Sequence, residues 1–350
     1  MIVKLKLWIA PLLIIFPTIS NAYTFDLPLK TQLAISGYLG YKQIFSNVHF
    51  DIIESEPELG LILDLKLSNN LHFFNQFQYG RTINEILTYN FLSYNLNINN
   101  DFNIVFKVGK IRYNFGLYNS TRVNPRTRQG VFQPQAIYFD KLDHTLDSGL
   151  GIGIDTNYRN FKFTYMIDKP NLINREEQIG LGQQPTKDFL NQNTSSFTGH
   201  QEVTLEYNYN DITRYKIGWD KLKVSYVDSN YYSLGVEHTL NDKFLVSAET
   251  IIKQPLNKNG IGYGMSTTGI YNFHPMFSLR ANWNQYNSPA SKHQIDYNLG
   301  INFHRNSYMA NLEGHYIRGG SLVDHNELVL DSRSFDNYYV IGMNFAYFFN

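Results

Sequence analysis

Long stretches of the 350-residue chain alternate between apolar and polar residues with a period of two. Clear examples are residues 59–68, 203–207, 294–303 and 308–316, where apolar side chains fall on one parity and polar ones on the other. Successive side chains of a β-strand point to opposite faces, so each stretch predicts a strand with one apolar and one polar face. The pattern indicates an all-β chain.

Stretches of this kind recur to the C-terminus, and most have about the length that a tilted strand needs to cross a bilayer. The breaks between them are alternately short and long, as in a transmembrane antiparallel β-barrel with short periplasmic turns and longer outer loops. We expect 16 strands with cores at 33–43, 58–67, 71–81, 87–98, 102–112, 149–158, 161–169, 201–208, 213–228, 231–239, 244–253, 262–272, 277–286, 293–303, 307–318 and 337–349.

One segment, 213–228, changes phase in its middle. Its apolar residues Ile217 and Trp219 occupy odd positions, whereas Leu222 occupies an even one. We interpret 213–228 as a single strand with a β-bulge at residues 220–221, because a bulge inserts one extra residue and absorbs such a change. The alternative is a hairpin, which would add a strand and break the even count.

The first residues predict export. Lys4 and Lys6 precede an apolar run at 7–19, and the small residues at 20–22 suit a signal peptidase. We therefore divide the chain into a signal peptide, 1–22, and a single barrel domain, 23–350, located in the outer membrane of a Gram-negative bacterium.

The composition agrees with this interpretation. The chain has 30 basic and 30 acidic residues, and the two lysines of the signal peptide leave 28 basic residues, so no nucleic-acid partner is expected. It has no cysteine, which excludes disulfides and Cys-ligated metal. Aromatic residues reach 15%. Some stand near strand ends, as in the interfacial girdles of barrels: Tyr79, Tyr89, Phe91, Tyr94, Phe102 and Tyr113.

The last strand carries an apolar row on odd positions from Tyr339 to Phe349. It resembles the terminal strand by which outer-membrane barrels are recognised for assembly, although Asn350 follows the aromatic residue here. A soluble β-sandwich or solenoid is the structural alternative, but the chain has no fixed repeat period.

The long break at 113–148 is the third outer loop in this scheme, and its charges are segregated. The stretch from Arg112 to Arg128 contains four arginines and no acid, while 129–148 carries three aspartates against one lysine. Facing charges across a passage would filter solutes by charge and dipole. The candidate constriction residues are Arg112, Arg122, Arg126, Arg128, Asp140, Lys141, Asp143 and Asp147. Alternatively, these side chains pair with one another and only hold the loop.

The strand end Gly109-Lys110-Ile111-Arg112 and the loop after it resemble a group of porin-like outer-membrane proteins, mostly uncharacterised. The motif covers about 40 residues. The resemblance implies a passive channel for small hydrophilic solutes in which the third loop folds into the barrel and narrows it. It also implies a homotrimer surrounded by outer-membrane lipid and lipopolysaccharide.

Residues on the polar faces are expected to line the lumen, with no sign of charge dominating. We select Lys107, Glu206, Arg280 and Glu313 as lumen-facing, alongside Asp64, Lys66, Glu202, Lys216, Glu237, Glu249 and Asp296.

Two other functions remain open. Asp143, His144 and Ser148 could be read as the catalytic group of a barrel hydrolase, but adjacent strand residues point oppositely and no hydrolase motif is present. A receptor or adhesin would use its outer loops, and residues 170–200 are long and polar, as such a surface requires. The ten histidines lack paired ligand spacing, so we expect no metal, no cofactor and no enzymatic activity.

Overall fold

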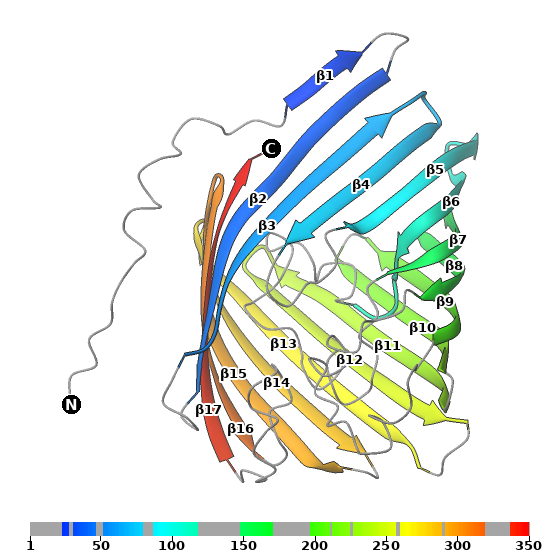
Figure 1. Ribbon diagram of the computed structural model, residues 1–350. Helices are drawn as coiled ribbons and strands as arrows, with labels where there is room; N and C mark the ends of the chain where they lie inside the picture. Colours follow the sequence, from blue (N-terminus) through cyan, green and yellow to red (C-terminus); the bar gives the residue numbers. More distant parts are fainter. Residues whose placement is uncertain are drawn as a thin grey trace, which may run out of the picture.

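The computed structural model describes residues 23–27, 31–46, 52–79, 87–117, 148–170, 197–210, 212–224, 227–256, 260–288, 291–318 and 337–349. These residues form 17 β-strands joined in one sheet, which curves into a barrel (Figure 1). The strands are β1 Tyr23–Leu27, β2 Thr31–Ser46, β3 Ile52–Lys66, β4 Leu71–Tyr79, β5 Leu87–Asn99, β6 Phe102–Arg112, β7 Ser148–Tyr158, β8 Phe161–Pro170, β9 Phe197–Tyr209, β10 Thr213–Val224, β11 Val227–Asn241, β12 Phe244–Pro255, β13 Gly262–His274, β14 Phe277–Ser288, β15 Ser291–Arg305, β16 Tyr308–Arg318 and β17 Asn337–Phe349.

The 16 strands β2 to β17 close the barrel, as predicted. Each pairs antiparallel with the next, and β17 pairs with β2 from Val340↔Ser46 to Phe349↔Gly37. Because the barrel is closed, each of these strands is paired on both sides. A sheet in lipid requires this pairing, since unpaired backbone N–H and C=O groups are costly there. Among the described residues, no helix is long and apolar enough to cross a membrane.

The short strand β1 is absent from the sequence prediction. It pairs with residues 31–35 of β2, next to the point where the pairing of β17 ends at Gly37. β1 and β17 therefore pair with successive parts of the same edge of β2, and β1 takes the part that β17 does not reach.

Short turns join alternate strand pairs at the positions predicted. Arg159, Asn210 and Asn306 adopt positive φ angles of 51°, 50° and 49° in three of them. In another, the backbone N–H of Asp101 donates to the side-chain oxygen of Asn99 at 2.9 Å. Asn tolerates left-handed backbone and bonds to its own turn, which explains its frequency at these breaks.

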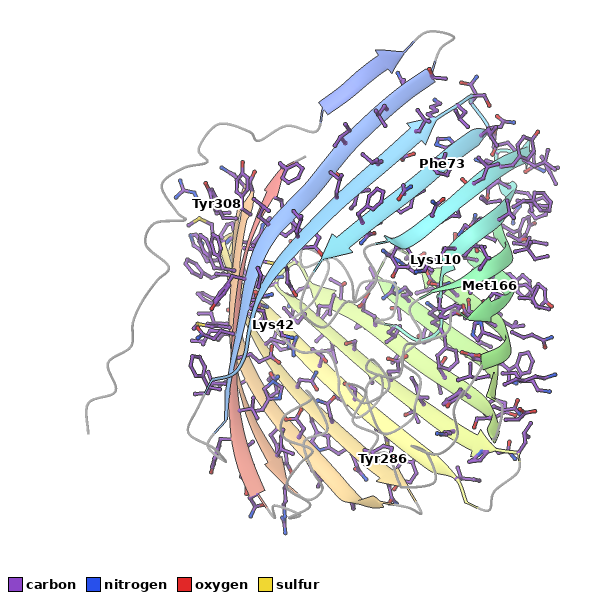
Figure 2. All side chains as sticks on the ribbon, in the orientation of Figure 1. Lys42, Phe73, Lys110, Met166, Tyr286 and Tyr308 are labelled. Atoms are coloured by element: carbon purple, nitrogen blue, oxygen red, sulfur yellow. The ribbon has the colours of Figure 1, made fainter. Side chains whose placement is uncertain are left out.

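The two faces of the wall differ as the alternation predicts. In β7, Leu150 and Ile152 on the outer face are 63% and 56% exposed, whereas Asp155 on the inner face is buried. Figure 2 shows side chains on both sides of the wall, with Tyr308 on the outer surface. The barrel thus presents an apolar exterior and a polar interior, the arrangement that suits lipid outside and water inside.

The aromatic residues chosen from the sequence for the girdle include three wrong ones. Phe91 packs against the interior apolar cluster that contains Tyr113. Tyr89 and Tyr113 lie in the interior and are 1% and 0% exposed. Other rings contact one another on the outer face close to the short turns: Phe161 with Tyr207, Tyr207 with Tyr215, Phe244 with Tyr271, Phe273 with Phe277, Phe277 with Phe303, and Tyr308 with Tyr347.

The expected β-bulge at residues 220–221 is also wrong. β10 ends at Val224, and its register with β11 is regular from Thr213↔His238 to Val224↔Val227. Its register with β9 shifts only between Lys223 and Val224. The phase does not change, because Leu222 faces inward as an apolar residue and is 3% exposed. The break between β10 and β11 therefore lies between Val224 and Val227, a few residues earlier than the predicted break between 228 and 231, and the strand count is unaffected.

Candidate functional site

The chain turns into the barrel immediately after β6. Residues 113–117, here called the loop root, are the first five residues of the predicted third loop (Figure 1). Tyr113, Phe115 and Leu117 are 0%, 0% and 2% exposed. They form an apolar cluster with residues that face inward from the wall: Ile111, Met166, Leu222, Tyr231, Ile251 and Tyr286. An apolar cluster inside a polar lumen explains why Leu222 lies on the inner face.

Glycines on the inner wall make room for the loop root. A Cβ at Gly235 would lie 2.5 Å from Cγ of Leu117, and one at Gly149 would lie 2.4 Å from the hydroxyl of Tyr113. At Gly218 the nearest ring atom of Phe115 would be 3.0 Å away. Real Cβ atoms do not approach other atoms this closely at the first two positions, so the loop root packs directly onto the backbone of the wall.

Two buried carboxylates accept hydrogen bonds from the backbone of the loop root. The N–H of Asn114 donates to both carboxylate oxygens of Glu202, at 2.9 and 3.1 Å. The N–H of Leu117 donates to Oε1 of Glu249 at 2.7 Å. Each carboxylate satisfies a backbone N–H of the loop root, and a buried hydrogen bond is costly to leave unmade, so these contacts fix the path of the loop.

The side chain of Asn114 extends this attachment to three strands. Its Nδ2 donates to the hydroxyls of Thr164 on β8 and Thr204 on β9, at 3.3 and 3.2 Å. The ammonium of Lys216 on β10 donates to its Oδ1 at 3.0 Å. The amide thus uses both its donor group and its acceptor within the wall.

A third buried group lies beside Tyr113. Its hydroxyl donates to Asp168 at 2.8 Å, and His200 stands between Asp168 and Asp220 with N···O distances of 2.8 and 2.9 Å. Burial, reinforced by the neighbouring Asp168 carboxylate, raises the pKa of the Tyr113 hydroxyl well above its usual value. The hydroxyl therefore stays protonated and remains a donor at any physiological pH.

Most of the predicted constriction residues lie outside the described part of the chain: Arg122, Arg126, Arg128, Asp140, Lys141, Asp143 and Asp147. Their role stays a prediction. Arg112 is described and lies at the end of β6, where its guanidinium donates to Gln76 at 3.2 Å and covers the ring of Tyr89 at 4.3 Å.

The four selected lumen residues fall on the inner face in two kinds of setting. Lys107 pairs with Asp155 across β6 and β7, and Glu206 accepts a hydrogen bond from Asn208. Arg280 and Glu313 form a buried ion pair of 2.9 Å that bridges β14 and β16.

The sequence analysis included Glu202, Lys216 and Glu249 among lumen-facing residues but did not identify their partner. The loop root is 88 residues from Glu202 and 132 from Glu249 along the chain, and no local pattern reveals such contacts. A usable signal was the apolar sequence of the loop root itself, since Tyr113, Phe115 and Leu117 continue the odd-position row of Ile111.

No protein-family model matches the sequence, and no curated protein matches it. Solved structures do match. OmpT, an outer-membrane protein of Vibrio cholerae, superposes with a TM-score of 0.61 at 12% identity, covering 94% of this chain and 100% of OmpT. The fold is that of an outer-membrane β-barrel protein.

Two porins agree with this fold. The anion-selective porin from Comamonas acidovorans matches with a TM-score of 0.59 at 9% identity, and a mutant of the Rh. blastica porin with 0.57 at 13%. In both comparisons 91% of this chain and 100% of the porin are covered. The chain therefore shares the fold of these porins, with a distant sequence.

Proposed function

We propose that this porin-like barrel is a passive channel for small hydrophilic solutes and that the loop between β6 and β7 narrows it. The observation that carries the proposal is the pair of hydrogen bonds from the backbone of Asn114 and Leu117 to Glu202 and Glu249. The first five residues of this loop lie inside the lumen and are held on the inner wall. A loop in this position reduces the free cross-section of the channel.

The remaining loop residues would supply the filter. In this proposal Arg112, Arg122, Arg126 and Arg128 lie on the basic side of the passage. Asp140, Asp143 and Asp147, with Lys141 among them, lie on the acidic side. Opposed charges set a transverse field that orders water and slows apolar solutes. One similar structure is an anion-selective porin, and the excess of arginine in the first half of the loop would favour anions here as well.

The channel is proposed to be non-enzymatic. Both buried histidines of the described inner wall face carboxylates: His200 lies between Asp168 and Asp220, and His315 lies between Asp296 and Glu313. The remaining alternatives are a receptor or adhesin that uses its outer loops, and a barrel hydrolase built on Asp143, His144 and Ser148.

We also propose export through cleavage of residues 1–22, surroundings of outer-membrane lipid and lipopolysaccharide, and a homotrimeric assembly. One of the similar OmpT structures is described as a trimer form, which supports the last point. Mobility in SDS before and after boiling tests it, since a heat-labile oligomer runs as a slower band only before boiling.

The test of the channel is conductance of the purified protein in a planar bilayer. Stepwise current increases are expected, with the step size proportional to bulk conductivity. A correctly folded barrel that gives no steps would contradict the channel and favour a receptor or an enzyme.

A further inference from the structure

The inner wall is not equally accessible to solvent around the barrel. The strands that follow a short turn can be compared at one depth, because the fourth residue of each points inward. On most of them this residue is at most 6% exposed: Thr164 on β8, Lys216 on β10, Ser247 on β12, Arg280 on β14 and Asn311 on β16. The equivalent residues of β4 and β6, Phe74 and Val105, are partly exposed. At this depth solvent therefore reaches the wall along β4 and β6.

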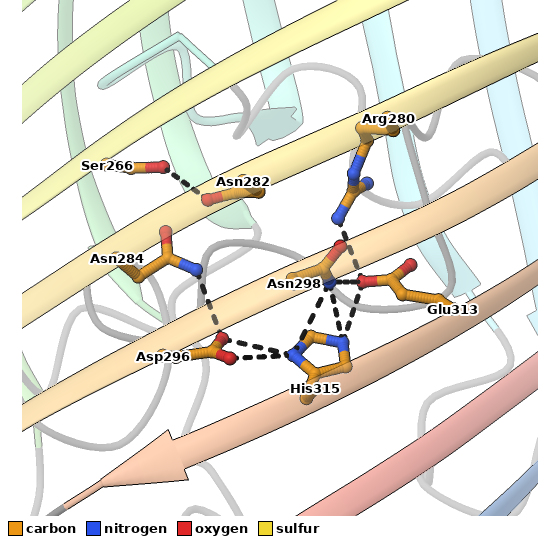
Figure 3. Close-up of polar contacts among 8 residues, drawn as sticks. All are labelled: Ser266, Arg280, Asn282, Asn284, Asp296, Asn298, Glu313 and His315. Carbon is orange, nitrogen blue, oxygen red and sulfur yellow. Dashed lines mark hydrogen bonds and ion pairs between the residues drawn. The ribbon is translucent and has the colours of Figure 1, made fainter.

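The buried part of the wall satisfies its charges internally. Arg280 of β14 donates to Glu313 of β16 at 2.9 Å, and His315 lies 3.0 Å from Asp296 and 2.8 Å from Glu313 (Figure 3). These four side chains are at most 5% exposed, so a solute in the lumen does not touch them. Contacts between solute and wall have to come from the part that solvent reaches.

That part is here called the accessible sector. It comprises exposed or partly exposed side chains on the inner faces of the consecutive strands β3 to β6: Asp64, His72, Phe74, Phe91, Val105 and Lys107. Half of these residues are apolar, although they face a lumen whose remaining described wall is mostly polar. Apolar surface that stays in contact with water inside a polar cavity marks a place where a ligand can bind.

Two phenylalanine rings stand at the centre of the accessible sector. Phe74 and Phe91 are directly opposite each other in the register of β4 and β5. Their rings stack, with centroids 5.3 Å apart and planes inclined by 28°. Phe91 also packs against the apolar cluster of the loop root, which holds one ring of the pair in place. The pair is therefore a fixed aromatic surface that is still partly open to the lumen.

Charged groups lie on both sides of the ring pair. Asp64 is opposite Phe74 in the register of β3 and β4, and its side chain is 51% exposed and 3.7 Å from His72. Nζ of Lys107 lies 5.8 Å from the centroid of the Phe91 ring and pairs with Asp155. A carboxylate accepts hydrogen bonds and an ammonium donates them. The ring pair thus has an acceptor on one side and a donor on the other.

We propose that Phe74 and Phe91 form a contact site for solutes that carry an aromatic ring beside hydroxyl groups, such as aryl glycosides, on their way through the barrel. This inference rests on the proposed channel and adds a class of solute to it. The ring of the solute packs on the exposed ring surface, in the offset-stacked or edge-to-face arrangement that aromatic pairs prefer. Its hydroxyl groups donate to Asp64 and accept from Lys107. A solute without a ring uses only the polar groups and is held more weakly.

The test adds phenyl β-glucoside or sucrose to a conducting channel in a planar bilayer and measures the loss of ion current beyond the change in bulk conductivity. Both solutes are uncharged, and sucrose is the larger molecule, so size exclusion alone predicts a greater loss with sucrose. The proposal predicts the reverse order, with a loss that saturates as the concentration of phenyl β-glucoside rises. An equal or greater loss with sucrose would overturn the proposal.

The variant Phe74→Leu locates the contact. Leu keeps an apolar side chain but has no ring, so the apparent dissociation constant for phenyl β-glucoside should rise by about fivefold, the value of one aromatic contact. The matched control is Phe277→Leu, because Phe277 pairs with Phe303 at 5.2 Å between centroids on the outer face of the wall. No rise in Phe74→Leu, or an equal rise in both variants, would contradict the placement of the site.

The comparison of the two solutes on the unchanged protein needs no variant, so a variant that fails to fold does not weaken the test. The two proposals also fail differently. A protein without stepwise current contradicts the channel and the contact site together. A conducting protein in which sucrose reduces the current at least as much as phenyl β-glucoside contradicts the contact site alone.

Discussion

The backbone N–H of Leu117 donates a 2.7 Å hydrogen bond to the carboxylate of Glu249, which lies 132 residues further along the chain. The acceptor is buried on β12 and the donor belongs to a loop that begins at the end of β6. This contact, with its counterpart between Asn114 and Glu202, determines where the third loop enters the lumen.

Replacement of Glu249 by Ala leaves the Leu117 N–H without its acceptor in a buried place. The loop root should lose about 1–3 kcal/mol of attachment, the usual cost of an unmade buried hydrogen bond. We expect noisier single-channel currents with transient larger conductance levels. Glu237→Ala is the control, because Glu237 pairs with Arg214 at 3.3 Å rather than with the loop. Identical noise in the two variants would argue against Glu249 as an anchor.

Replacement of Gly235 by Ala puts a methyl group where Leu117 lies. A Cβ there would stand 2.5 Å from Leu117 Cγ, so the loop root must shift away from the wall. The expected result is a changed single-channel conductance with an intact barrel, measured beside the heat-dependent mobility in SDS. Gly269→Ala serves as control, since no atom lies within 4 Å of a Cβ at that position. A wild-type conductance in Gly235→Ala would refute the close packing.

Replacement of His200 by Ala leaves Asp168 and Asp220 as buried carboxylates without their common partner. Breaking a buried ion pair by removing one member typically costs about 3–5 kcal/mol. The midpoint of urea unfolding in detergent should therefore fall clearly. His72→Ala should have little effect, because the side chain of His72 is 36% exposed and its contact with Asp64 is 3.7 Å. Equal midpoints for both variants would show that the buried group adds no stability.

Charge reversal of Arg122, Arg126 and Arg128 tests the filter. If these side chains face the passage, the reversal potential in a salt gradient should move toward cation preference. The control reverses Lys243 and Arg305, which lie at the short turns of the opposite end of the strands. An unchanged reversal potential would assign the three arginines to holding the loop.

The barrel was predictable because lipid outside and water inside impose alternation on every strand. The prediction failed where inward-facing side chains contact other protein atoms instead of water. Leu222 faces the lumen but contacts the apolar cluster of the loop root, so its position looked like a change of phase. Tyr89 and Tyr113 resembled girdle residues but are buried inside for a similar reason.

The sequence predicted the position of the two carboxylates that hold the loop root, but not their partners. The alternation placed Glu202 and Glu249 on the polar face, but their partners are backbone N–H groups, which every residue except proline carries and which leave no trace in a sequence. The short strand β1 was missed because five residues are too few for a periodic pattern, and its pairing with β2 becomes evident only once the barrel closes.

The most direct test of the inserted loop uses the absence of cysteine in the chain. Asn114 and Thr204 contact each other through their side chains at 3.2 Å, so a short bifunctional thiol reagent with a reducible disulfide should join the pair Asn114→Cys with Thr204→Cys in the folded barrel. The account predicts efficient cross-linking and a conductance that reduction does not change. Failure to cross-link, while the pair Asn103→Cys with Asn157→Cys on the paired strands β6 and β7 does so, would contradict it.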